Sequence, residues 1–288
     1  MKRRVCLVVC LVLLLIFGVI PAGAMAADAI DVVDAADVTE TVDMAGIALP
    51  VPASITVFDW AGLLAAVNAG ESVIELENDI TAEGVLTIQN GFDITLTSVG
   101  GTWTLYSAPG MRHFNIGAIG PNSGGTLTLL DVVLDGNQNG GGVNLVTVNA
   151  ANLRRLNVGV GSVIQNCVTA GNGGGVFAQG VGSSVVIDGG IIQNNVAGGN
   201  GGGIMATGAG STIEMNSGTI QGNTANGGDG GGGVNVASGA FTMNGGLIYD
   251  NTANNGGGVR IGSARFLMTD GTVQGNTANV GGGVVGIQ

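Results

Sequence analysis

A pattern of apolar residues ending in asparagine recurs six times in the C-terminal half of the chain. With Φ for an apolar residue, the pattern is Φ-x-Φ-x-x-x-x-Φ-x-x-Asn, and Gly-Gly-Gly followed by Val or Ile comes soon after each asparagine. Repeats of this size predict a solenoid, in which each coil packs only against its neighbours. The asparagines are spaced at intervals of 29, 29, 28, 28 and 25 residues: Asn137, Asn166, Asn195, Asn223, Asn251 and Asn276.

Glycine supplies 56 of the 288 residues and charged residues only 10%, a composition that is also typical of flexible linkers. The hydrophobic content of 45% argues against a linker, and the glycines keep fixed offsets from the apolar residues. Collagen is excluded because glycine does not occupy every third position. We therefore expect one elongated domain with a continuous apolar core.

The N-terminus has the features of a secretory signal peptide. Three basic residues, Lys2 to Arg4, precede an apolar run from Val5 to Ile20, and small residues at Ala24 and Ala26 suit cleavage after Ala26. We expect residues 1–26 to be removed and the protein to be secreted or displayed at the cell surface. An uncleaved membrane anchor is the alternative. Cys167 is then the only cysteine of the mature chain, so no intramolecular disulfide can form.

Removal of residues 1–26 takes away three positive charges and leaves five arginines and 20 acidic residues, a net charge of 5 − 20 = −15. A surface of this sign repels nucleic acid and anionic lipid. We therefore expect no nucleic-acid partner and no membrane insertion after signal removal.

Residues 27–52 carry acidic residues at a spacing near three, which keeps no single helical face, so a disordered acidic leader is expected. A weakly structured metal-binding tract is the alternative for this segment. Residues 53–71 contain apolar residues at helical spacing from Phe58 to Val67, with Asp59 as N-cap and Gly70 at the end. This segment predicts a short helix that covers the open edge of the first strand.

Residues 72–288 are assigned to the solenoid, with three strands and three corners in each coil. In the coil that begins at Ile213, Ile213 and Met215 point inward, and Val234 and Val236 leave Asn235 pointing outward. Two inward columns follow from the repeat. They are Leu129, Val158, Ile187, Met215, Met243 and Met268, and Leu134, Val163, Ile192, Ile220, Ile248 and Val273.

The six repeated asparagines are predicted to form an internal ladder. An unsatisfied buried amide costs about 1–3 kcal/mol, and stacked coils can satisfy each amide through the neighbouring coil. N-glycosylation is the alternative, but Asn223-Thr-Ala lacks the required Asn-x-Ser/Thr pattern.

The repeat, the glycine corners and the N-terminal helix together resemble the pectin-lyase-like superfamily of right-handed parallel β-helices over residues 58–288. The similarity is closest to its glycine-rich branch of bacterial surface proteins and polymorphic outer-membrane adhesins. It implies an all-β, right-handed parallel β-helix of about eight turns with an N-terminal capping helix. The same scaffold carries lyases, glycosidases and adhesins, so the resemblance implies no single activity.

Polysaccharide lyases of that superfamily gather acidic calcium ligands and an arginine base on one outward face. The outward column after the glycine corners instead reads Asn144, Phe177, Met205, Asn235 and Arg260, which we take as a candidate ligand-contact face. Neither this column nor the outward column of the first strand clusters carboxylates. No catalytic residue, metal site or cofactor is therefore assigned.

Three other motifs are weaker. Gly227-Gly-Asp-Gly-Gly resembles a calcium-binding repeat but lacks its later Asp, because Gly232 stands there. His113 has no second metal ligand or nucleophile near it in sequence and is expected in a solvated turn. Arg154 and Arg155 are expected to be exposed, with contact to an acidic glycan as the alternative.

The sequence thus predicts a non-enzymatic, exported structural stalk or adhesin that contacts carbohydrate or a host or cell-surface protein. The alternative is a partial or degenerate polysaccharide lyase or glycoside hydrolase. The repeat that ends at Gln288 stops within its third strand, so we expect a truncated chain whose C-terminal edge pairs with further repeats or another chain.

Overall fold

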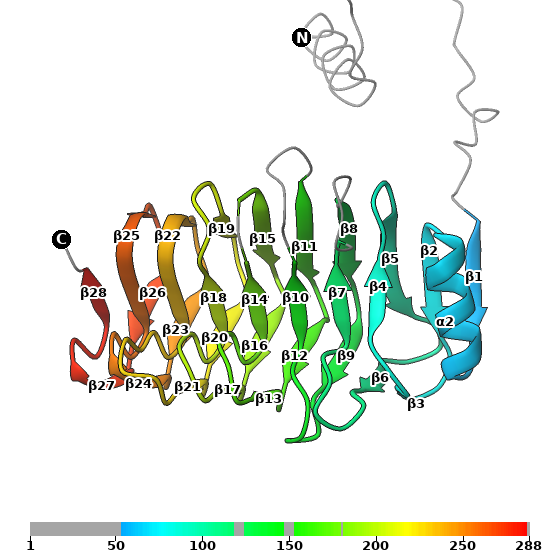
Figure 1. Ribbon diagram of the computed structural model, residues 1–288, viewed down its shortest axis with the longest axis horizontal. Helices are drawn as coiled ribbons and strands as arrows, with labels where there is room; N and C mark the ends of the chain where they lie inside the picture. Colours follow the sequence, from blue (N-terminus) through cyan, green and yellow to red (C-terminus); the bar gives the residue numbers. More distant parts are fainter. Residues whose placement is uncertain (1–52, 118–123, 147–152, 180, 287–288) are drawn as a thin grey trace, which may run out of the picture. The chain divides into compact units, whose positions relative to one another are not determined.

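The computed structural model describes residues 53–117, 124–146, 153–179 and 181–286. The expected signal peptide and acidic leader, residues 1–52, lie outside the described residues. The described residues form a parallel β-solenoid, as the repeat predicted, with one short helix near the N-terminal end of the described chain. It has about 7 turns, one fewer than the eight expected from the sequence. Successive coils follow one axis from α2 to β28 (Figure 1).

Three parallel sheets run along the described part of the solenoid. In the 15-stranded sheet A, β22 and β25 each span two faces and join them. The first face contains β1 (Ser54–Val57), β2 (Val73–Leu76), β5 (Asp93–Ser98), β8 (Gly125–Leu129), β11 (Arg154–Gly159), β15 (Ser183–Asp188), β19 (Thr212–Met215), β22 (Val234–Met243) and β25 (Val259–Met268). The second face adds β4 (Leu86–Ile88), β7 (Phe114–Ile116), β10 (Val143–Leu145), β14 (Val176–Ala178), β18 (Ile204–Ala206) and β28 (Val284–Gly286).

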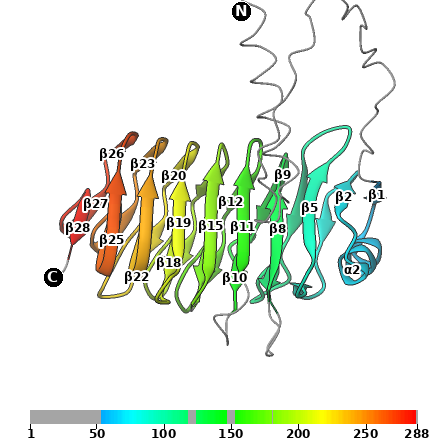
Figure 2. The same ribbon diagram turned by 90° about the horizontal axis from the view of Figure 1, so that it is seen from above.

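Sheets B and C close each coil (Figure 2). Sheet B has eight strands among the described residues: β3 (Ile80–Thr81), β6 (Trp103–Tyr106), β9 (Val132–Asp135), β12 (Val163–Gln165), β16 (Ile191–Gln193), β20 (Thr219–Gln221), β23 (Leu247–Tyr249) and β26 (Thr272–Gln274). Sheet C has five: β13 (Val168–Thr169), β17 (Val196–Ala197), β21 (Thr224–Ala225), β24 (Thr252–Asn255) and β27 (Thr277–Val280).

The expected helix is α2 (Trp60–Ala69), and its caps are those predicted. The Asp59 side chain accepts a hydrogen bond from the Gly62 N–H, and Gly70 ends the helix at a φ of 74°. Leu63, Ala66 and Val67 are buried against the solenoid, where the helix contacts β1, β2 and β4. Strand β1 lies before the helix and pairs with β2, so the segment 53–71 holds a strand of sheet A as well as the helix.

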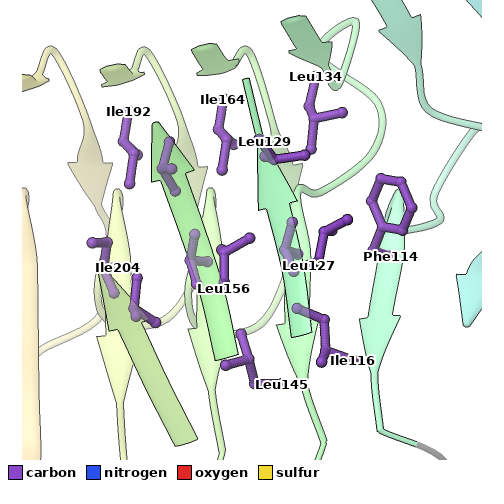
Figure 3. Packing of buried hydrophobic residues seen from close by; sticks show 14 of the residues in the cluster. Phe114, Ile116, Leu127, Leu129, Leu134, Leu145, Leu156, Ile164, Ile192 and Ile204 are labelled. Carbon is purple, nitrogen blue, oxygen red and sulfur yellow. The ribbon is translucent and has the colours of Figure 1, made fainter. Parts of the chain in front are cut away.

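Apolar side chains from all three sides of each coil fill the interior (Figure 3). The first predicted inward column is present, and its members are directly paired from Leu129 to Met268. Met268 itself is 40% exposed because it lies in the last described coil. Each buried aliphatic side chain contributes about 1.5–3 kcal/mol to folding, which offsets part of the entropy lost by the glycines.

The second inward column corrects the sequence prediction by one residue. Ile164, not Val163, pairs with Leu134 and Ile192, and Val163 lies on the outer face of sheet B. The register therefore places Cys167, not Asn166, beside Asn195. Asn166 instead aligns with Asn194, and both adopt left-handed backbone conformations, with φ of 52° and 55°.

The asparagine ladder is present from Asn195 to Asn276. The Oδ1 of Asn223 accepts hydrogen bonds from the backbone N–H and the Nδ2 of Asn195, at 3.0 and 2.9 Å, and its Nδ2 donates to the Ile192 carbonyl. Asn251 and Asn276 repeat this arrangement, and Cys167 donates its N–H to the Oδ1 of Asn195. Asn195, Asn223 and Asn251 are fully buried, so the buried-ladder prediction is confirmed for them.

Asn137 and Asn166 are not members of the ladder. Asn137 is exposed, with a left-handed φ of 48°. Asn166 is half-buried, and its Nδ2 donates to the Asp135 carboxylate at 2.9 Å. The prediction was wrong for Asn166 because its coil has one more residue between the inward positions Val158 and Ile164 than the next coil has between Ile187 and Ile192, so the ladder position falls on Cys167. Asn137 has the expected offset from Leu134, but the backbone turns into the left-handed region at Asn137 and Gln138 and leaves Asn137 exposed.

Candidate functional site

The outward column named from sequence is one column in the structure. Asn144, Phe177, Met205, Asn235 and Arg260 pair in that order through β10, β14, β18, β22 and β25. Their alignment confirms the predicted register after the glycine corners.

The accessibility predicted for this column is wrong for three of its members. Met205, Asn235 and Arg260 are 5%, 0% and 9% exposed, whereas Asn144 and Phe177 are half-buried. The glycine corner that precedes each strand lies against the outward side chain. A Cβ at Gly201, for example, would lie 2.7 Å from the Cβ of Met205. The glycine corner therefore covers side chains that point away from the core.

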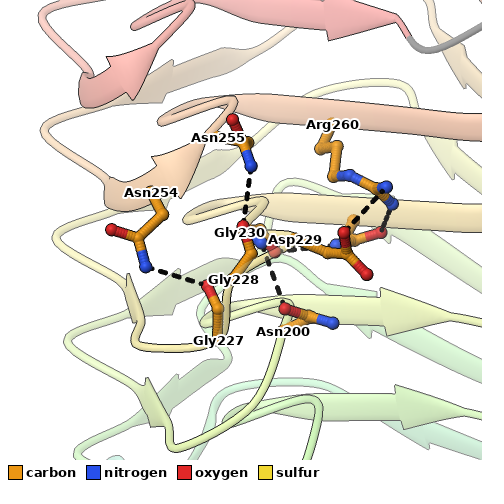
Figure 4. Close-up of polar contacts among 9 residues, drawn as sticks. Asn200, Gly227, Gly228, Asp229, Gly230, Asn254, Asn255 and Arg260 are labelled. Carbon is orange, nitrogen blue, oxygen red and sulfur yellow. Dashed lines mark hydrogen bonds and ion pairs between the residues drawn. The ribbon is translucent and has the colours of Figure 1, made fainter.

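Arg260 is held by intramolecular contacts at the end of this column (Figure 4). Its Nη2 lies 3.4 Å from Oδ1 of Asp229, and its Nη1 donates to Oδ1 of Asn235 at 3.5 Å. Asn235 in turn donates to the Gly230 carbonyl at 2.7 Å. Because the Asp229 side chain is 65% exposed, the ion pair contributes little stability. The polar groups of Asn235 and Arg260 are therefore used in contacts within the protein.

Asp229 also belongs to residues 227–231, the segment that resembles a calcium-binding repeat. Its carboxylate pairs with Arg260. The Asn200, Asn254 and Asn255 side chains bond to backbone atoms of the segment, as Figure 4 shows. Over the described ranges, no group of three or more His, Cys, Asp or Glu side chains is placed to hold a metal ion.

His113 and Arg154 are both buried, contrary to the solvated positions expected from sequence. His113 is 0% exposed, and its Nε2–H donates to the Asp135 carbonyl at 3.1 Å. Arg154 is also 0% exposed because it shares the inward side of β11 with Leu156 and Val158, whereas Arg155 on the other side is exposed. An acidic glycan can therefore reach Arg155 but not the pair together.

A polar column on the outer face of sheet B was not predicted. It is formed by the outward side chains of the second strand of each coil. Each member is a polar residue or a tyrosine that pairs with the next member on the neighbouring strand. The members are Tyr106, Asp135, Gln165, Gln193, Gln221, Tyr249 and Gln274. We call it the amide column.

Hydrogen bonds run along the amide column in one direction. Gln221 Nε2 donates to Gln193 Oε1 at 2.6 Å, and Gln193 Nε2 donates to Gln165 Oε1 at 2.8 Å. Gln165 Nε2 then donates to Asp135 Oδ2 at 2.8 Å. A carboxylate only accepts, so Asp135 fixes which way each amide points. Each glutamine keeps a second N–H and a second oxygen lone pair for an outside partner.

An aliphatic column lies beside the amide column on the same face. It consists of the residues two positions before the amide column, which pair in the order Val133, Val163, Ile191, Thr219 and Leu247; four of the five are aliphatic, and all are partly exposed. Together the two columns form a face that offers both hydrogen bonds and apolar contact. Tyr106, at the first position of the amide column, and Tyr249, next to its last residue Gln274, are also partly exposed and lie five coils apart, about 24 Å at the spacing of parallel strands.

Comparison of the chain with protein-family models, curated proteins and solved structures gives no match. None of the helical structure in the described residues has the length and apolar character needed to cross a bilayer.

Proposed function

We propose that the protein is an exported, extracellular or cell-surface stalk whose sheet B face binds a neutral glycan. We further propose that it belongs among the pectin-lyase-like β-helices, near their glycine-rich adhesins. The parallel solenoid and the internal asparagine ladder support that kinship. Export rests on the sequence of residues 1–26.

The amide column carries the glycan proposal. Sugar rings offer hydroxyl groups at their edges and apolar C–H faces, and the two columns of sheet B offer amides and aliphatic side chains in parallel rows. Tyr106 and Tyr249 add aromatic rings that each carry a polar hydroxyl group. Asp135 is the only charged side chain in the amide column, and it already accepts hydrogen bonds from Gln165 and Asn166. A neutral polysaccharide therefore fits this face better than an acidic one.

Binding to insoluble neutral polysaccharides, measured by co-sedimentation of the purified protein, tests the proposal. Tyr249→Ala and Gln221→Ala change neighbouring members of the amide column and should each reduce binding. Thr252→Ala is the matched control, since Thr252 is exposed on sheet C near Tyr249 in the sequence. Equal binding by all variants, or no binding by the parent protein, would contradict the proposal.

The enzymatic alternative predicts a different result from the same samples. Glycoside hydrolysis requires two carboxyl groups about 5–9.5 Å apart, and the amide column supplies one. Release of reducing or unsaturated ends by the parent protein would favour a polysaccharide-degrading enzyme over a binding stalk.

A further inference from the structure

The second coil replaces a glycine corner with larger side chains. Val143 pairs with Phe114, and the Gly141 N–H and Gly142 carbonyl bond to Met111 and His113, respectively. This register places Met111, Arg112 and His113 where the next coil has Gly140, Gly141 and Gly142. The later coils keep glycine at these positions, so this corner departs from the repeat where the repeat is otherwise most constant.

A cavity of about 410 Å³ lies beside this corner. Arg112 and Met111 line it together with the next coil and strand β13, which contribute Gln138, Asn139, Val168 and Thr169. Gln138 has a φ of 58° and follows Asn137 at 48°, so two consecutive non-glycine residues are left-handed here. Strained backbone of this kind persists where the surrounding structure holds it and is frequent at binding sites.

The Arg112 guanidinium forms no ion pair with a described residue. Its Nη2 donates to the Asn172 carbonyl at 2.9 Å, while its buried Nη1 has no hydrogen-bond partner among the described residues. Across the same residues, the single ion pair is the distant one between Arg260 and Asp229.

The neighbouring titratable groups do not pair with Arg112. The Asp135 carboxylate, which lies near His113 and Cys167, accepts hydrogen bonds from Asn137, Gln165 and Asn166 instead. Burial lowers the pKa of Arg112 to about 10, so it stays protonated at neutral pH. Burial raises the pKa of the Cys167 thiol to about 12 and lowers the pKa of His113 to about 4, so both are neutral there. A buried N–H of a charged group that lacks a hydrogen-bond partner, as at Arg112 Nη1, is costly. A ligand in the adjoining cavity is the remaining place for a negative group.

We propose that this cavity binds a small oxyanion, a carboxylate or a sulfate group, with Arg112 as its charge partner. Gln138 and Asn139 line the same cavity, and their side-chain amides are N–H donors of the kind an oxyanion accepts from. Charge-assisted hydrogen bonds to a guanidinium suit both anions, the planar carboxylate in particular. This site is separate from the amide column and does not depend on glycan binding.

Isothermal titration of the whole protein with sodium acetate and with sodium sulfate, at constant ionic strength, tests the site. At least one salt should bind saturably, and the tighter one identifies the preferred geometry. Arg112→Gln should weaken that binding by about tenfold or more, the effect of losing a charged hydrogen bond. Arg155→Gln removes the same charge from an exposed position and should bind as the parent does. No saturable binding by the parent, or equal affinity in Arg112→Gln, would overturn the proposal.

Gly141→Ala provides a second variant that keeps the arginine. A Cβ at Gly141 would lie 3.7 Å from Cζ of Arg112 and 3.6 Å from Cβ of Thr169, ordinary contact distances that the fold tolerates. The added methyl group would occupy space beside the guanidinium, so anion affinity should fall while the thermal unfolding curve without anion changes little. Unchanged anion affinity in this variant would also count against the site.

Discussion

Gly203 packs directly against the side chain of Asn223, and a Cβ at Gly203 would lie 3.1 Å from the Asn223 Nδ2. The same relation joins Gly233 to Asn251 and Gly175 to Asn195, at 3.1 and 3.0 Å. The third glycine of each triplet and the ladder asparagine therefore pack against each other. The missing side chain of the third glycine makes room for the amide that closes the coil.

Asn223→Ala should lower the free energy of unfolding by about 3 kcal/mol, since it leaves the buried N–H and Nδ2 of Asn195 without their shared acceptor. Guanidinium unfolding followed by circular dichroism measures the change. Asn226→Ala, at an exposed position in the same coil, is the control and should be near neutral. Equal stability of the two variants would argue that the ladder contributes nothing.

Gly203→Ala should destabilise the protein by about 1–3 kcal/mol because the methyl group would overpack the corner. Its Cβ would lie 2.6 Å from the Gly233 carbonyl oxygen as well as near Asn223. Gly283→Ala changes the same position of the last described coil, where no described atom lies within 4 Å of the new Cβ. Melting temperatures should fall for the first variant only, and a similar loss in both would refute the packing argument.

Gln193→Glu should destabilise the protein at pH 7 by about 1–2 kcal/mol, because a carboxylate cannot donate to Gln165 Oε1. Gln165 cannot turn to compensate without losing its bond to Asp135. At pH 4 the protonated carboxyl group can donate again, so the difference from the parent should shrink. Gln274→Glu, at an exposed position, is the control. A pH-independent difference would mean that the amides are not directionally ordered.

His113 should make stability decrease as the pH falls from 6.5 towards 4. Burial lowers its pKa from 6.5 to about 4, so in this range the unfolded chain binds a proton that the folded protein excludes. The effect reaches about 3 kcal/mol at its lower end. His113→Gln should give a flatter profile of unfolding free energy against pH than the parent. Parallel profiles would show that His113 is not buried in its neutral form.

The sequence was sufficient to predict the solenoid, its first inward column, all but one member of the second, and the caps of α2. These features depend on periodicity and on local residue types such as Asp59 and Gly70, which act within one coil or one helix turn. Phe58 was expected on the helix, but it precedes the N-cap and is 57% exposed. Helical spacing alone does not show whether a hydrophobic residue lies before or after the N-cap.

The one-residue shift at Asn166 had a detectable signal. Gln165-Asn-Cys and Gln193-Asn-Asn align when the glutamines are matched, which places Cys167 in the ladder. The residue before each ladder position adopts a left-handed φ in five coils, and only asparagine, aspartate and glycine occur there: Asn166, Asn194, Gly222, Asp250 and Gly275. Counting intervals between asparagines alone could not reveal this bend.

Burial at the candidate sites could not be predicted from alternation. Strand geometry states only that Met205 and Asn235 point away from the core. That the glycine corner then covers them depends on how the chain turns between sheets C and A. The isolation of Arg112 likewise depends on neighbours from distant parts of the sequence, such as Asn172 and Cys167.

The ladder has a constant interval of 28 residues between Asn195, Asn223 and Asn251. A coil duplicated in frame at this interval would meet equivalent atoms above and below, without new loops or caps. Tandem duplication or deletion in the gene could therefore change the length of the rod in steps of about 4.8 Å while leaving the remaining rungs intact. Recombination could therefore adjust the length of the solenoid by one coil at a time.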